Sequence, residues 1–433
     1  MASDRAFYGS AGKPLRETAG HDIVVTGAGV CCNMGDDLAD IENNLRAGRN
    51  IPFERWQVAV DLAARCQVIG QYHGDVSDAA LGIGKKLSRF MGRGSRVALK
   101  AALTATKQSG LFESSLPHLA ARNVAVVFGS GTGDVETHIE VRRKLDETHD
   151  VKRVSPTVIP RLMASTVSAN LVNVLRTTGP SFTATAACAG GAYNLLLAKS
   201  LIDSGHAKAA IAGGVEVCDT HFFAGFDAMG AYNGRDNDRP ERASRPYAAD
   251  RAGFIFSEGS GAVVLERRED AEKRGAQILG VLRGFGMSSD GQGDMVAPAA
   301  AGALASMRTA LEVSGVDAGE IGYVNTHGTS TPLGDVSEVK AIREVFAGRH
   351  VPYSSTKGYI GHTISAAGVI EAIFTLAMLR GGWLAPSVNA TPLDSELESY
   401  PPVIGPTDAN VRYALSNSFG FGGTNASLLL SAT

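Results

Sequence analysis

The chain has 433 residues, of which 44% are apolar and 20% are charged, and its formal net charge is -3. These values are typical of an ordinary globular protein. They exclude a disordered or fibrous chain and give no general electrostatic reason to expect a nucleic-acid partner. The length predicts two or three domains, or one large duplicated unit.

The five cysteines are few for this length, odd in number and without paired CxxC spacing: Cys31, Cys32, Cys66, Cys188 and Cys218. This pattern argues against a disulfide framework and structural zinc, and it favours a reducing compartment. Residues 1–22 contain no apolar stretch typical of a signal peptide, so a cytoplasmic location is expected. The most apolar window, 363–379, is short for a membrane span and contains Glu371, which predicts a buried helix and no membrane association.

The first predicted element is a buried strand at residues 21–30, where β-branched residues cluster before a glycine turn. Helical spacing of apolar residues follows at 95–111. A strand and a small-residue loop then follow at 123–134.

The second half of the chain repeats this order, with a helix at 305–316, a strand at 321–325 and a loop of small polar residues at 326–335. In each half a short extended segment also turns through small residues into a long apolar helix, at 183–205 and 355–379. We interpret this repetition as an internal duplication. Strands that are apolar on both faces and alternate with helices predict an α/β architecture of sheets covered by helices.

Cys188 lies in TATAACAGGAYN, where small residues lead into two glycines and a helix. A sulfur at a helix N-terminus is close to free N–H groups, which favour the thiolate and lower the thiol pKa. The alternative is a small buried apolar side chain, the common environment of a free cysteine.

His327 in NTHGTSTPLGD and His362 in KGYIGHTISAAG are surrounded by residues too small to shield an imidazole from a cavity. Two histidines can donate hydrogen bonds to one developing oxyanion. Either one alone is more often a structural histidine bonded to backbone. Lys357 could orient or polarise a histidine, or it could be an ordinary surface lysine.

The near-terminal SNSFGFGGTNAS contains Gly420, Gly422 and Gly423, which would let backbone N–H groups approach a substrate, although a tight turn is the simpler interpretation. TGAGVCC resembles a dinucleotide-binding loop, but Cys32 replaces its third glycine. GSGTGDVE lacks the ending of a P-loop, and no spaced set of metal ligands is present. We therefore expect no NAD, nucleotide or metal cofactor.

Four segments together, TAACAGG, VNTHGTSTPLGD, STKGYIGHTISAAG and SNSFGFGGTNAS, closely resemble the elongating β-ketoacyl-acyl carrier protein synthases. The resemblance extends over nearly the whole chain. It implies a thiolase fold, in which two duplicated βαβαβαββ halves form five layers, α-β-α-β-α, and assemble as a homodimer. We place the halves at residues 1–268, with Cys188, and 269–433, with His327 and His362.

The resemblance also implies a decarboxylating Claisen condensation. Cys188 would carry an acyl chain as a thioester, and malonyl carrier protein would lose carbon dioxide to give the attacking carbanion. His327 and His362 would stabilise the enolate oxygen, and the backbone N–H groups of Cys188 and Phe421 would form the oxyanion hole. The substrates arrive on the phosphopantetheine of acyl carrier protein, so no cofactor is expected.

Further roles are carried over from the family motifs. Lys357 matches a supporting lysine, Asp335 an acid that would pair with it, and Glu371 a buried glutamate that orders the site. The remaining matches are expected to bind substrate. Thr329 and Thr331 would bond the pantetheine arm, Thr132 would lie at the acyl pocket, and Phe419 would also contact substrate. A threonine at position 132 is intermediate in size, so it does not indicate an acyl length.

The basic run KKLSRFMGRGSR could dock the acidic carrier protein or could be a solvated helix face. Its basic residues are Lys85, Lys86, Arg89, Arg93 and Arg96.

Two related kinds of protein are alternative interpretations of the chain. A chain-length factor is a non-catalytic partner of a ketosynthase, and such partners lose the nucleophile. A thiolase typically uses a second active cysteine, and the last 200 residues contain none. The residues present favour an active ketosynthase, as a homodimer or paired with a chain-length factor.

Overall fold

A computed structural model of the chain describes residues 22–51, 53–112, 123–292, 295–296 and 300–433. Residues 1–21 of the expected polar leader lie outside these ranges. Ten strands form a continuous sheet, in the spatial order β10 (Tyr353–Ser354), β9 (Ile321–Asn325), β13 (Tyr413–Gly420), β14 (Thr424–Ser431), β8 (Gly280–Ser289), β1 (Ile23–Cys31), β7 (Gly259–Arg267), β6 (Ala209–Glu216), β4 (Val124–Ser130) and β5 (Ser181–Phe182).

This strand order shows an internal duplication. The first half of the chain contributes β1, β4, β5, β6 and β7, and the second contributes β8, β9, β10, β13 and β14. In both halves the strands lie side by side in the order third, second, fourth, fifth, first. The halves join where β1 and β8 pair antiparallel, from Ile23 opposite Leu282 to Val25 opposite Gly280. The predicted duplication is confirmed.

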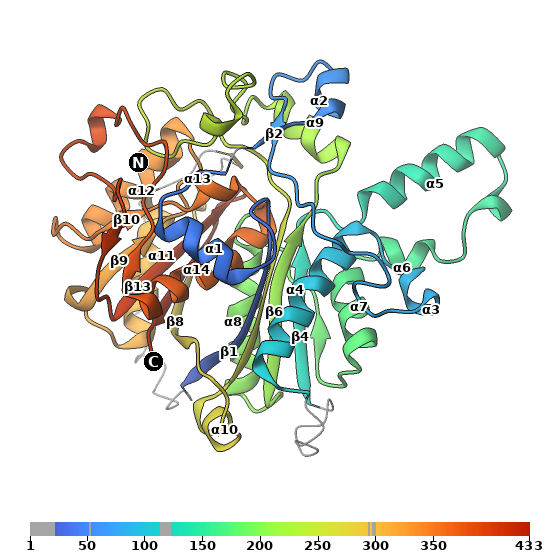
Figure 1. Ribbon diagram of the computed structural model, residues 1–433, viewed down its shortest axis with the longest axis horizontal. Coiled ribbons are helices and arrows are strands. Elements are labelled where there is room, and N and C mark those ends of the chain that lie inside the picture. The colour runs from blue at the N-terminus through green and yellow to red at the C-terminus, as the bar shows by residue number, and fades with distance from the viewer. Residues whose placement is uncertain (1–21, 52, 113–122, 293–294, 297–299) are drawn as a thin grey trace, which may run out of the picture.

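Helices cover both halves of the sheet and also separate them (Figure 1). Helix α8 (Gly190–Asp203) and helix α14 (Ala367–Gly381) pack against each other, and each contacts strands of both halves. On the outer faces, α4 (Arg93–Ser109) and α7 (Thr166–Leu175) cover the first half, and α11 (Ala300–Ser314) and α12 (Pro332–Val345) pack on the second half. This is the five-layer thiolase fold that the resemblance implied.

The remaining elements lie in the connections: α1 (Leu38–Arg46), β2 (Glu54–Arg55), α2 (Gln57–Asp61), β3 (Val68–Ile69), α3 (Lys85–Ser88), α5 (Val135–Thr148), α6 (Val158–Leu162), α9 (Thr220–Ala228), α10 (Arg268–Lys273), α13 (Lys357–Ile360), β11 (Trp383–Leu384) and β12 (Thr407–Asp408), with five short 3-10 turns. Helix α5 projects away from the body of the molecule (Figure 1).

The helix predicted at 363–379 is confirmed as a core helix. The helical run Ile364–Gly381 is long and apolar enough to cross a membrane by composition alone, but 89% of that window is buried inside the protein. One predicted loop is shorter than expected, because α12 begins at Pro332. Proline favours the first helical position, since its missing N–H would have no partner there.

The glycines of the TGAGVCC segment serve helix packing. Gly27 and Gly29 lie in β1 beneath α4. A Cβ atom at these positions would lie 2.0 Å from the carbonyl oxygen of Ala105 and 2.1 Å from that of Ala101. Only glycine lets the strand and the helix approach this closely.

Gly27→Ala is therefore expected to destabilise the protein by about 1–3 kcal/mol, because the added methyl group forces α4 away from the sheet. Gly94→Ala is the matched control, since its added Cβ would meet only a Val217 methyl group at 3.7 Å. Urea unfolding of the two variants measures the difference. Equal stabilities would contradict the packing argument.

Candidate active site

Cys188 lies in a strained turn between β5 and α8, two residues before the helix begins. Ala187 has a φ of +44°, in the left-handed region that L residues rarely adopt. The C-terminal hairpin supports this turn, because the Thr424 hydroxyl donates to the Ala186 carbonyl at 3.2 Å. A Cβ atom on Gly420 would lie 3.1 Å from the backbone nitrogen of Cys188, so glycine there permits the close approach.

His362 is fixed through its backbone just before a 3-10 turn (Ile364–Ala366) that leads into α14. Its N–H donates to the Ile255 carbonyl at 2.7 Å, and its own carbonyl accepts from Ser257 at 3.1 Å. Its side chain is only 2% exposed, and neither ring nitrogen has a partner among the described residues. The imidazole is therefore held in place but left available for a ligand.

His327 follows β9 and is held by a glutamate that the sequence analysis did not identify. Glu338 on α12 is buried, and it accepts hydrogen bonds from the backbone N–H groups of His327 and Gly328, both at 2.9 Å. Asn417 on β13 donates to the same carboxylate at 3.0 Å. Glu338 thus fixes the loop that carries His327. The only sequence signal was an acidic residue three positions after Asp335.

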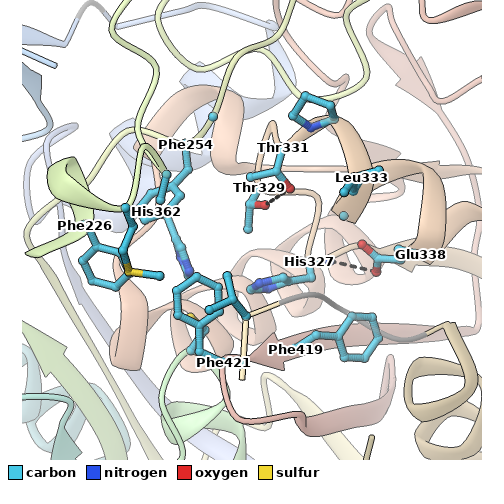
Figure 2. Close-up of a pocket in the computed structure, with 18 of the residues that line it drawn as sticks. Phe226, Phe254, His327, Thr329, Thr331, Leu333, Glu338, His362, Phe419 and Phe421 are labelled. Atoms are coloured by element: carbon cyan, nitrogen blue, oxygen red, sulfur yellow. Dashed lines mark hydrogen bonds between the residues drawn. The ribbon is translucent and has the colours of Figure 1, made fainter. Parts of the chain in front are cut away.

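These elements bring Cys188, His327 and His362 together, as predicted. The cysteine sulfur and one nitrogen from each histidine all lie within 4.8 Å of one another. The two imidazole centroids are 5.2 Å apart at an interplanar angle of 84°. Figure 2 shows the two rings facing the same space, with Phe421 beside them and Glu338 behind His327. A Cys-His-His set can also hold zinc, so geometry alone leaves two chemistries.

Lys357 is buried at the start of α13, where its ammonium group pairs with Glu371 of α14. The expected partnership between Lys357 and Asp335 is wrong. Asp335 instead pairs with Arg251 at 3.1 Å and accepts hydrogen bonds from the backbone N–H groups of Tyr247 and Ser330. Both ion pairs satisfy charges that would be costly to bury alone.

Burial sets the protonation states of the site. It lowers the pKa of both His327 and His362 well below the usual value, and the positive charge of Lys357 lowers them further. Both imidazoles are therefore neutral near pH 7. A neutral imidazole has one N–H to donate and one nitrogen to accept a proton.

The predicted low pKa of Cys188 is wrong for the resting site. Burial raises the pKa of this thiol to about 11, although Lys357 and the backbone N–H groups of Phe421 and Cys188 act in the opposite direction. Desolvation therefore outweighs the helix N-terminus. The thiol must lose its proton as it reacts, and a neutral imidazole lies nearby to accept it.

A cavity of about 650 Å³ connects the three side chains with the surface. Thr329 and Thr331 line it, with their hydroxyl oxygens 3.0 Å apart. Phe419 and Phe421 also line it, as do exposed apolar residues at the rim such as Leu333. The cavity could hold an elongated, largely apolar ligand with a few polar groups.

Other predicted site residues lie elsewhere. The Thr132 hydroxyl donates to Glu216 at 3.1 Å, and Thr132 does not line this cavity. Lys85 and Lys86 are exposed on α3, and Arg89 follows them. Two members of the basic run have structural partners instead, because Arg93 pairs with Glu258 at 2.7 Å and Arg96 pairs with Asp78 at 2.8 Å.

Comparisons with known proteins agree with this geometry. The family model for the N-terminal domain of β-ketoacyl synthases matches residues 20–271, and the model for the C-terminal domain matches residues 279–391. Relatives include 3-oxoacyl-[acyl-carrier-protein] synthase 1 of Escherichia coli strain K12, 38% identical over 94% of this chain and 98% of the relative. The corresponding synthase 2 of Vibrio cholerae is 36% identical over the same shares.

Solved structures show the same relationship. A β-ketoacyl synthase from Burkholderia phymatum STM815 has a TM-score of 0.88 and 33% identity, covering 95% of this chain and 100% of that one. The ishigamide ketosynthase/chain length factor has a TM-score of 0.83 and 28% identity, covering 95% and 99%. The chain therefore belongs to the β-ketoacyl synthase family of acyltransferases.

Proposed function

We propose that this protein joins an acyl chain carried on Cys188 to malonyl-acyl carrier protein, with loss of carbon dioxide, in fatty acid or related polyene or polyketide biosynthesis. The proposal rests on one observation. The Cys188 sulfur and the neutral imidazoles of His327 and His362 lie together in one cavity. The names of the curated relatives support the carrier-protein substrate. The substrates bring their own thioesters, so the reaction requires no cofactor.

In the first half-reaction, the Cys188 sulfur attacks the thioester carbonyl of the acyl carrier protein while an imidazole accepts the thiol proton. The N–H groups of Cys188 and Phe421 stabilise the tetrahedral oxyanion. The carbon–sulfur bond to the carrier then breaks, and the carrier thiol leaves with the proton.

In the second half-reaction, malonyl carrier protein loses carbon dioxide and forms an enolate. Neutral His327 and His362 each donate one N–H to the enolate oxygen. The nucleophilic carbon attacks the Cys188 thioester, the new carbon–carbon bond forms, and the Cys188 sulfur leaves as a thiolate and takes a proton from solvent. Lys357 and Glu371 hold their charges next to the histidines as a buried pair, and we assign them a positioning role.

The proposal predicts that Cys188→Ala abolishes acylation and condensation while malonyl decarboxylation continues. His327→Ala and His362→Ala should lower decarboxylation by about 100-fold or more, because each removes an enolate donor. Intact-mass spectrometry of the acylated protein and carbon dioxide release measure the two steps. Wild-type protein that neither acylates nor decarboxylates would contradict the proposal and favour a non-catalytic chain-length factor.

Carrier-protein docking remains a proposal, now restricted to Lys85, Lys86 and Arg89. All three are exposed, and none forms an ion pair within the described part of the chain. Arg93 and Arg96 are bound to Glu258 and Asp78, which leaves them less free to recruit an acidic partner.

Reversing two of these charges, Lys85→Glu/Lys86→Glu, is expected to raise the KM for carrier-bound malonyl by about tenfold at low salt, with little change in kcat. The reaction of a malonyl-pantetheine thioester without the protein carrier should be unaffected. Lys107→Glu/Lys208→Glu makes the same charge change at exposed positions away from α3 and is the control. An equal effect of both double variants would rule out a specific docking site.

We also propose a homodimer, acting in the cytoplasm, with a chain-length factor as the alternative partner. Helix α5 buries only Thr137 and packs on α6 and the 3-10 turn Val151–Arg153. Large apolar side chains beside it are exposed, including Val151 at 74% and Ile159 at 72%. Strand β5 also lies at the end of the sheet order, with β4 as its one neighbour. These features are typical of a surface that another subunit covers.

Ile159→Asp/Val151→Asp is expected to convert the dimer to monomer, because burying the two carboxylates in an interface is costly. Ile404→Asp places one carboxylate at a residue that is 56% exposed in the connection between β11 and β12, and should leave the dimer intact. Sedimentation velocity distinguishes the species. A monomeric wild-type protein would contradict the homodimer.

A further inference from the structure

A second buried glutamate, Glu216, holds two segments of the chain near Cys188. Glu216 is the last residue of β6 and is 1% exposed. It accepts hydrogen bonds from the Gly131 N–H at 3.0 Å, the Ser130 hydroxyl at 3.2 Å and the Thr132 hydroxyl at 3.1 Å. One carboxyl group therefore binds three consecutive residues of the loop after β4.

The same carboxyl reaches the segment that carries His362. Its Oε2 atom accepts a hydrogen bond from the Ser365 N–H at 3.4 Å. Ser365 in turn lies against the first turn of α8, because a Cβ atom on Gly190 would be 2.6 Å from the Ser365 hydroxyl oxygen. A Cβ atom on Gly191 would be 2.9 Å from the Ser365 carbonyl oxygen. Glu216 thus connects the loop after β4 to the packing that supports Cys188.

Burying the Glu216 carboxyl carries a desolvation cost, so its contribution to the fold needs an explanation. Glu216 forms no ion pair within the described part of the chain, and its negative charge raises the pKa of the nearby Cys188 thiol. Burial raises the pKa of Glu216 itself to about 7. An apolar residue would fill the same space without a desolvation cost, but it could not accept these hydrogen bonds. Accepting them is what the carboxyl group contributes.

We propose that Glu216 is a positioning residue for the acylation half-reaction: through Ser365 it holds the start of α8, and with it Cys188, in the geometry that attack requires. This inference rests on the proposed function. Glu216 would position Cys188, which acts in acylation, and Glu338 would position His327, which acts in decarboxylation. His362 keeps its own backbone hydrogen bonds to Ile255 and Ser257, so loss of Glu216 should slow acylation without slowing decarboxylation.

The test compares Glu216→Ala with Glu216→Gln in the full-length protein. Alanine removes all four hydrogen bonds. Glutamine can keep them, because its oxygen accepts from the two N–H groups while its amide donates to the two hydroxyl oxygens. Acylation of Cys188 from an acyl carrier protein, followed by intact-mass spectrometry, should slow by roughly 10- to 100-fold in the alanine variant. It should stay within about threefold of wild type in the glutamine variant.

Carbon dioxide release from malonyl carrier protein provides the second measurement. It should be unchanged in both Glu216 variants and should fall in Glu338→Gln, the comparison variant on the His327 side. Circular dichroism checks folding. If the alanine variant does not fold, Ser130→Ala/Thr132→Val removes two of the four bonds and should still slow acylation selectively.

Three results would overturn the inference: normal acylation in a folded alanine variant, an equal loss of decarboxylation, or a glutamine variant as slow as alanine. In each of these cases the wild-type protein still performs both half-reactions. A failure of the proposed function looks different, because the wild-type protein then performs neither.

Discussion

The active site depends on one close contact, where the first turn of α8 lies on the turn that follows His362. Gly190 and Gly191 contribute one side and Ser365 the other, with no room for a side chain on either glycine. Since α8 belongs to the first half of the chain and α14 to the second, this contact brings Cys188 next to His362. Neither half could form the site alone. A bulkier residue in this layer would separate the nucleophile from the imidazole.

Burial at this contact determines the protonation states of the side chains. It favours the neutral forms of Cys188, His327 and His362, so both histidines lose their protons and the cysteine keeps its own. Neutral histidines are the useful form, because each can both donate and accept. The buried ammonium group of Lys357 contacts Glu371 rather than the cysteine, and its charge lowers the thiol pKa less than burial raises it. The cysteine is therefore a neutral thiol near pH 7 in this structure.

Local patterns in the sequence predicted a duplicated α/β architecture and the three central residues, and the family resemblance implied the five-layer form. Strand β9 coincides with its predicted range, and the small residues around His327 and His362 predicted that both imidazoles face a cavity. The ion-pair partners were harder to predict, since Asp335 and Glu371 are both buried acids on helices and only the packing shows which one faces Lys357. The same holds for Arg93 and Arg96, which look like surface charges in a basic run but reach Glu258 and Asp78 across the fold. Desolvation of Cys188 likewise depends on the complete packing rather than on the helix start.

Equivalent loops of the two halves are each held by a buried glutamate. The loops after β4 and after β9 each follow the second strand of their half, and in each a buried carboxylate accepts backbone N–H groups. In the second half the loop carries a histidine, whose ring enters the cavity. In the first half the equivalent loop carries Gly131, where a Cβ atom would lie 2.6 Å from Glu216. One loop thus supplies a reactive side chain and the other supplies only support. Because the two carboxylates come from different elements, β6 and α12, a change in one loop can occur without moving the other.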